Sequence, residues 1–252
     1  MNSDKVTFAM EGRIGIITLS RPDRGNACDP DLIGQLLDAA RRASREAIGA
    51  LLLRAEGANF CVGADLRHFA GSDQPIADDL RSMADGFHEA LALIAELPVP
   101  VVGAVQGNAV GAGFGLALAC DHLLIADDAK FATGYVRLGL SSDAGVSYFL
   151  TRALGERLAR SLLIVPRTIG AAEAMTLGLA DRIVDAGSLV QAARELAGKL
   201  AGGPAGAYAA IKRLTAAAHS RPLRDHLDQE RDEIVALARD PAVAERMRAI
   251  LG

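Results

Sequence analysis

Two glycine-containing turns carry the first candidate chemistry. One is Gly-Ala-Asp-Leu at 63–66, and the other is Gly-Asn-Ala-Val-Gly-Ala-Gly at 107–113. The second turn joins an apolar, β-branched predicted strand, 99–106, to a predicted buried helix, 111–120. Small residues leave backbone N–H groups uncovered, and those at a helix start lie at the positive end of the helix dipole. The turns therefore predict a place that binds an anion or stabilises one formed during a reaction.

Other interpretations of the same stretch are less consistent with its residues. The uncharged run from Leu97 to Cys120 is long enough to span a bilayer, but prolines, glycines, Gln106 and Asn108 interrupt it. A dinucleotide-binding fingerprint needs a third glycine where Leu116 stands, and no phosphate-binding loop ending in Gly-Lys-Ser/Thr occurs. Glycine used only for packing is the alternative that composition leaves open.

Asp143 is a carboxylate with two interpretations. It stands in Leu-Gly-Leu-Ser-Ser-Asp-Ala-Gly, directly before a predicted helix over 144–154. An aspartate in that place is first of all a helix N-cap, and spacing alone favours this role. The same side chain can also act as an acid–base group or as a nucleophile.

Other polar residues do not form a recognisable site. His68 and Asp73 fall in a polar segment, 67–79, for which we expect a mobile, solvated loop. No group of residues has metal-ligand spacing, so no metal is expected. The cysteines are odd in number and indicate a reducing compartment; they are Cys28, Cys61 and Cys120.

Strands and helices alternate along the chain and would position these groups. A hairpin opens the chain, Asp29-Pro30 predicts a helix start, and a helical tail closes the chain. The predicted strands are 6–10, 14–19, 48–54, 99–106, 122–126 and 180–184; the predicted helices are 30–45, 80–97, 111–120, 144–154, 159–164, 168–177 and most of 188–252. This pattern indicates an α/β layer fold with parallel strands covered by helices.

Composition limits the classes of partner and location. The 252 residues are 50% hydrophobic, and the formal net charge is −4 without any basic run. Nucleic acid and membrane are therefore not expected as partners. The start of the chain has no apolar signal region, so the cytoplasm is the expected location.

Five segments together resemble the crotonase superfamily, the enoyl-CoA hydratase/isomerase family. They lie in the expected order and cover nearly the whole chain: 21–29, 59–66, 98–121, 131–155 and 168–184. The resemblance implies a spiral of ββα units forming stacked sheets over 1–187. It also implies a C-terminal helical region, 188–252, that mediates a homotrimer or a dimer of trimers.

The family resemblance further implies an acyl thioester of coenzyme A as the ligand, with no separate cofactor. Its shared chemistry is a thioester enolate whose oxyanion is held by two backbone N–H groups. By match these belong to Ala64 and Ala112. Further residues would line the path of the thioester and its coenzyme A: Arg24, Ala27, Asp65, Leu66, Gly111 and Lys212, with Arg213 as an alternative to Lys212.

The chain departs from the family where hydratases carry two glutamates. Those positions match Gly115 and Tyr135, neither of which can take a proton from water near neutral pH. One isomerase branch of the family carries a catalytic aspartate where Asp143 stands. We therefore expect an enoyl-CoA Δ-isomerase in which Asp143 moves a proton, with Tyr135 as a further catalytic residue.

Several alternatives stay open. Aryl-CoA dehalogenases of the family use an aspartate at this position as a nucleophile, with glycine at the Gly115 position. Their helper histidine matches Ala92, while His88 lies one helical turn earlier on the same face and could substitute. An enoyl-CoA hydratase, an inactive acyl-CoA binder and a purely structural trimer are the remaining hypotheses.

Overall fold

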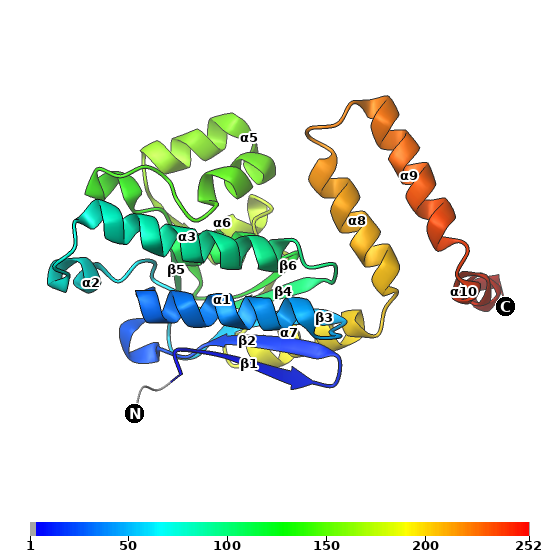
Figure 1. Ribbon diagram of the computed structural model, residues 1–252, viewed down its shortest axis with the longest axis horizontal. Helices are drawn as coiled ribbons and strands as arrows, with labels where there is room; N and C mark the ends of the chain where they lie inside the picture. Colours follow the sequence, from blue (N-terminus) through cyan, green and yellow to red (C-terminus); the bar gives the residue numbers. More distant parts are fainter. Residues whose placement is uncertain (1–3, 252) are drawn as a thin grey trace. The chain divides into compact units, whose positions relative to one another are not determined.

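The computed structural model describes residues 4–251 and divides into two compact units, Met1–Gly202 and Gly203–Gly252 (Figure 1). Residues 1–3 and 252, which belong to the two predicted regions, lie outside the described residues. The alternation of strands and helices expected from the sequence is present, so the α/β class is confirmed. No helix among the described residues is long and apolar enough to cross a membrane.

A six-stranded sheet forms the centre of the first unit. Its strands follow the order β1-β2-β3-β4-β6-β9, and only the hairpin pair β1–β2 is antiparallel. Buried β-branched and aliphatic runs form the inner strands, as expected for a sheet covered on both faces. The strands are β1 (Val6–Glu11), β2 (Ile14–Leu19), β3 (Ala50–Ala55), β4 (Val101–Val105), β6 (His122–Ala126) and β9 (Arg182–Val184).

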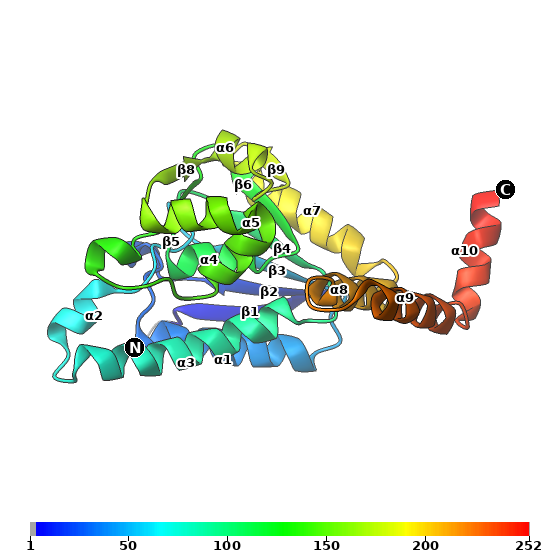
Figure 2. The same ribbon diagram turned by 90° about the horizontal axis from the view of Figure 1, so that it is seen from above.

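The pleat of the central strands divides the core into two clusters. Leu51 and Leu53 of β3 belong to a large cluster that includes α1 (Pro30–Arg45) and α3 (Ile76–Ala95). Leu52 points to the opposite face, where it packs in a cluster with α7 (Leu189–Ala201). Figure 2 shows α1 and α3 running side by side along the sheet.

A second, three-stranded sheet carries the residues around the candidate site. Its order is β5-β7-β8, with β5 (Asn108–Val110) parallel to β7 (Lys130–Ala132) and β7 antiparallel to β8 (Thr168–Gly170). The predicted helix over 168–177 is wrong at its start, because Thr168 is a strand residue paired with Ala132 and α6 (Ala171–Thr176) begins after it.

The segment 67–79 is not the loop that its composition predicts. Helix α2 (Leu66–Gly71) begins directly after Asp65, whose carboxylate accepts a hydrogen bond from the Arg67 N–H. Helix α3 then starts at Ile76, so only a short polar turn separates the two helices. The N-cap at Asp65 explains the difference, because a short capped helix tolerates an otherwise polar sequence.

The second unit contains three helices: α8 (Ala205–Ala217), α9 (Leu223–Leu237) and α10 (Pro241–Leu251). Short non-helical segments at 202–204 and 221–222 precede α8 and α9. An ion pair between Arg213 and Glu233 links α8 to α9. By its contacts α7 belongs to the first unit, although its sequence was grouped with the helical tail.

Candidate active site

The first predicted donor, the Ala64 N–H, lies in a segment held by its neighbours. Cys28 N–H donates to the Gly63 carbonyl at 2.8 Å, and Asp65 N–H donates to the Cys28 carbonyl at 2.8 Å. These two bonds form a parallel bridge between Cys28 and Ala64 and leave the Ala64 N–H on the other side of the chain. Within residues 4–251, that N–H donates to no protein acceptor.

The second predicted donor, the Ala112 N–H, begins the short helix α4 (Ala112–Leu118). Gly111 precedes it with a φ of 54°, a left-handed value that favours glycine, and its N–H is taken by the Ala132 carbonyl. The Ala112 N–H belongs to the first helical turn, and no acceptor for it occurs among the described residues.

A close backbone approach brings these two segments together. Cys61 bridges Ala109 in parallel, and the Val110 N–H donates to the Cys61 carbonyl at 2.9 Å. A Cβ added to Gly113 would lie 2.1 Å from that carbonyl oxygen, and one added to Gly63 would lie 3.8 Å from the Ala112 nitrogen. The backbones of the two segments therefore lie against each other. Two unpaired N–H groups on adjoining segments can hold one anionic oxygen.

Asp143 is not a helix cap. Helix α5 (Val146–Ile164) begins at Val146 after Gly145, without a side-chain cap, and it bends at Gly155. The Asp143 carboxylate instead lies with Oδ1 at 2.7 Å from Nε2 of His88 on α3. Both side chains are about half exposed, so the pair can reach a ligand.

Tyr135 supports the segment that carries Asp143. It begins the short helix η2 (Tyr135–Leu138), and its hydroxyl donates to the Asp143 backbone carbonyl at 3.0 Å. Burial raises the pKa of the phenol well above its usual value, and the nearby Asp143 charge raises it further. Tyr135 is therefore a hydrogen-bond donor at neutral pH rather than a base.

Gly115 has no room for the side chain that hydratases carry at this position. A Cβ on Gly115 would lie 1.9 Å from the carbonyl oxygen of Ala144. The chain around Asp143 thus occupies the space beside α4. The structure adds a steric reason to the chemical one for the absence of a two-glutamate site.

The predicted coenzyme A residues near the first donor lie on two adjacent loops. Asn26, fully buried, links the loops because its amide donates to the carbonyls of Glu56 and Asn59. Arg24 ends the helix η1 (Pro22–Arg24) and is exposed, and the Ala27 carbonyl accepts from Arg21. The sequence analysis missed Asn26.

Asp65 and Leu66 have different environments. The Asp65 carboxylate pairs with Arg21 at 3.0 Å, whereas Leu66 is exposed. Lys212 lies on α8 in the second unit, and its neighbour Arg213 is paired with Glu233. Binding of coenzyme A by these residues stays a prediction.

His68 and Asp79 form a second pair on α2 and α3. Their Nε2 and Oδ2 atoms are 3.6 Å apart, and both atoms are buried without a hydrogen-bond partner. Asp73, by contrast, lies in the turn between the helices. No group of three or more His, Cys, Asp or Glu side chains within 4–251 could hold a metal ion.

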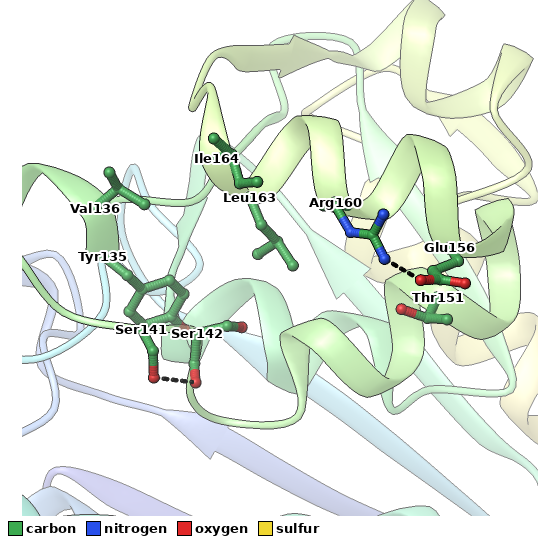
Figure 3. Close-up of a pocket in the computed structure, with 9 residues that line it drawn as sticks. All are labelled: Tyr135, Val136, Ser141, Ser142, Thr151, Glu156, Arg160, Leu163 and Ile164. Atoms are coloured by element: carbon green, nitrogen blue, oxygen red, sulfur yellow. Dashed lines mark hydrogen bonds and ion pairs between the residues drawn. The ribbon is translucent and has the colours of Figure 1, made fainter.

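A cavity of about 350 Å³ lies beside the Tyr135 segment. Figure 3 shows Tyr135 and Ser142 on one side of it and Leu163 and Ile164 on another. The other lining residues are Val136, Ser141, Thr151, Glu156 and Arg160. Its walls come from the segment before Asp143 and from both halves of the bent helix α5.

His88 is the functional candidate to which the sequence analysis assigned only a substitute's role. It lies one turn before Ala92 on α3, and Leu91 beside it is buried toward the core. The periodicity of α3 could place His88 on a face, but it could not show which distant segment that face meets. Only the fold shows that it meets Asp143.

The chain is similar to known proteins over most of its length. The family model described as enoyl-CoA hydratase/isomerase matches residues 9–249. A 4-chlorobenzoyl coenzyme A dehalogenase-2 from Arthrobacter sp. is 31% identical over 98% of this chain and 90% of its own length. The 1,2-epoxyphenylacetyl-CoA isomerase of Escherichia coli (strain K12) is 34% identical over 88% of this chain and 86% of its own.

The fold of the chain is also similar to that of a solved structure. The crystal structure of an enoyl-CoA hydratase from Polaromonas sp. JS666 superposes with a TM-score of 0.91 at 34% identity. The match covers 98% of this chain and 96% of that chain. The chain has the crotonase fold and belongs to the enoyl-CoA hydratase/isomerase family.

Proposed function

We propose that this acyl-CoA enzyme is an enoyl-CoA Δ-isomerase that uses Asp143 as its single acid–base group. The contact between Asp143 and His88 carries the proposal, because it holds a carboxylate in the site where the family's glutamates are absent. Gly115 and Tyr135 supply neither a base nor space for one. Asp143 is therefore the group available to move a proton.

The reaction would begin with the thioester oxygen between the Ala64 and Ala112 N–H groups. The Asp143 carboxylate takes a proton from Cα of a 3-enoyl thioester, and the C–H electron pair becomes the C1–C2 double bond as negative charge moves onto the oxygen. The resulting dienolate then takes a proton from the Asp143 carboxyl at Cγ, which leaves the double bond at the 2 position. No water, electron or second substrate is consumed.

The remaining residues of the proposed site bind the thioester. Arg24, Ala27, Asp65, Leu66 and Gly111 would line its path, and Lys212 would meet its phosphates. The full sequence holds no signal that requires another cofactor. We propose that the enzyme acts in the cytoplasm as a homotrimer or a dimer of trimers.

The first experiment follows deuterium from D₂O into a panel of saturated, 2-enoyl, 3-enoyl and aryl-CoA thioesters by mass spectrometry. The half-exposed Asp143 carboxyl can exchange its proton with solvent between the two transfers. We therefore expect deuterium at Cγ of the 2-enoyl product, and at Cα of the 3-enoyl substrate when the dienolate returns to it, together with migration of the double bond. Asp143→Asn should slow both by about 10²- to 10⁴-fold, the usual contribution of one general acid–base group. The matched control is Asp38→Asn, an exposed carboxylate on α1.

Two outcomes would contradict this assignment. Exchange that Asp143→Asn leaves unchanged would show that another group is the base. Binding of thioesters without turnover of any of them would instead indicate an inactive acyl-CoA binder.

His88 favours a second candidate function, the dehalogenation of an aryl-CoA with Asp143 as the nucleophile. An imidazole beside Asp143 can activate the water that this reaction needs. In this reaction the Asp143 carboxylate attacks the chlorine-bearing ring carbon of an aryl-CoA, a C–O bond forms, and chloride leaves with the C–Cl electrons. Water then adds to the ester carbonyl, frees Asp143 and leaves the hydroxyl on the ring with release of one proton. Chloride release from 4-chlorobenzoyl-CoA would favour this function over isomerisation.

A further inference from the structure

The contact between Gly115 and Ala144 joins α4 to the segment that carries Asp143. The Ala144 carbonyl oxygen lies where a Cβ of residue 115 would be, at 1.9 Å from the ideal position. Backbone cannot yield at that distance as the end of a flexible side chain can. An alanine at 115 would therefore push the Ala144 peptide away from α4.

The same segment has an unusual backbone. Ala144 has a φ of 54°, and Gly145 follows with a φ of 72°. A left-handed conformation is uncommon for alanine and costs free energy, so it persists only where the surroundings enforce it. Here Ala144 is buried, and its carbonyl is pressed against α4.

Three further contacts fix the chain on either side of Ala144. The Asp143 carbonyl accepts hydrogen bonds from the Tyr135 hydroxyl at 3.0 Å and from the Val146 N–H at 3.1 Å. A Cβ on Gly145 would lie 3.0 Å from Leu91 on α3, so this segment also approaches the helix that carries His88. The position of the Ala144 peptide is thus coupled to the distance between Asp143 and His88.

We propose that Gly115 and Ala144 are positioning residues that seat the Asp143 segment on α4 and set the Asp143–His88 contact. Glycine at position 115 then has a structural role in addition to the absence of the family's glutamate. It makes the room in which the carbonyl of residue 144 lies and from which the Asp143 side chain turns toward α3. The inference rests on the proposed function in one respect, namely that Asp143 is the reacting carboxylate.

The first test compares Gly115→Ala with Gly34→Ala. Both glycines are helical, but a Cβ at Gly34 meets nothing within 4 Å. Gly115→Ala should lower kcat by about 100-fold, the cost of misplacing a reacting group by roughly 1 Å. The dissociation constant for the matching saturated thioester should change little, and Gly34→Ala should keep the wild-type kcat.

A double-mutant cycle separates positioning from general damage. If Gly115 acts through Asp143, then Asp143→Asn should cost far less in the Gly115→Ala background than in the wild type. Losses that simply add would overturn the proposal, and so would a Gly115→Ala enzyme with the wild-type kcat.

Substitutions at position 144 test the same contact through its other residue. They replace the first test if Gly115→Ala does not fold. Ala144→Gly accepts a φ of 54°, whereas Ala144→Val does not. Valine should therefore lower kcat much more than glycine does. Equal losses in the two variants would contradict the proposal.

Crystal structures of the wild type and Gly115→Ala test the Asp143–His88 contact directly, and this test does not depend on a reaction. The 2.7 Å contact between Asp143 and His88 should be present in the first and lost in the second. If it is retained in both, the inference is wrong whatever the reaction. If it is lost while no thioester reacts with the wild type, the inference holds and the proposed function fails.

Discussion

Asp143 and His88 are 55 residues apart in the chain and meet in space at 2.7 Å. An imidazole in this place has two separate uses. It can orient the carboxylate by a hydrogen bond, or it can take a proton from water in a later step. The two uses make different demands on the side chain, and substitution can separate them.

His88→Gln and His88→Ala form a matched pair for this purpose. Glutamine keeps a hydrogen-bond donor but is not a base, so it should retain much more isomerase activity than alanine does. If His88 instead activates water, the two variants should fail equally and should accumulate an aryl ester on Asp143 with an aryl-CoA substrate. Rates and intact-protein mass measured side by side distinguish the two results.

Little of this pairing could be predicted from the sequence. The turns at Ala64 and Ala112 were found because small residues and glycines mark them locally, and the structure places both N–H groups unpaired on adjoining segments. Asp143 was found by resemblance, while local spacing favoured a cap. The cap is wrong because left-handed residues at 144 and 145 delay the helix to Val146. Left-handed alanine has no local sequence signal.

At the scale of elements, helix α1 shows what local signals can predict. Asp29 caps it as expected, accepting a hydrogen bond from the Leu32 N–H at 2.8 Å. The Asp29 carboxylate also pairs with Lys5 at 2.6 Å and with Arg21 at 3.2 Å. These pairs join the residue before β1, the loop after β2 and the start of α1, and the sequence predicted none of them.

The Asp29 pairs predict a pH dependence of stability. Burial alone would raise the pKa of this carboxyl, but the Lys5 and Leu32 hydrogen bonds and the Arg21 and Lys5 charges outweigh burial and lower it. The pKa of Asp29 is lower in the folded protein than in the unfolded chain. The pairs therefore stabilise the fold fully at pH values above the pKa of the unfolded chain, and this stabilisation is lost as the pH falls through the pKa of the folded protein.

Asp29→Asn isolates this effect, because asparagine caps a helix about as well as aspartate. The variant should have a lower free energy of unfolding than the wild type at pH 7. The difference should shrink as the pH is lowered toward and below about 4, the ordinary value for aspartate. Urea titrations across this range measure it. A difference that stays constant with pH would contradict the argument.

Elements without strong local signals were predicted less well. The stretch 67–79 is rich in polar residues, yet α2 and the start of α3 form there. Asp65 caps α2, whereas α3 begins after Pro75 without a side-chain cap and buries Met83, Phe87 and Leu91 further along. Thr168 resembles a helix cap in sequence but pairs with Ala132 in a strand, a contact across 36 positions that no local pattern specifies.

At the scale of the molecule, α9 presents apolar side chains that the described chain leaves exposed. They are Leu223, Leu227, Ile234 and Val235. Exposed apolar clusters of this kind mark contacts with other chains. They are consistent with the trimer or dimer of trimers that we propose.

Sedimentation equilibrium tests the proposed assembly. We expect a mass three or six times that of one chain. Leu223→Glu with Ile234→Glu should shift the protein toward monomers, because a buried charge without a partner is costly. Arg224→Gln on the same helix serves as the control. A wild-type monomer would contradict the proposed assembly.

The oxyanion-binding donors that we propose have a consequence for mutagenesis. Both are main-chain groups, and both belong to residues that are already alanine. An alanine scan of the whole protein would therefore pass over positions 64 and 112 and would leave the contribution of both N–H groups unmeasured. Replacing the amide by an ester at either position removes the N–H itself. Semisynthesis, rather than side-chain exchange, is thus the route to measuring what these two groups contribute.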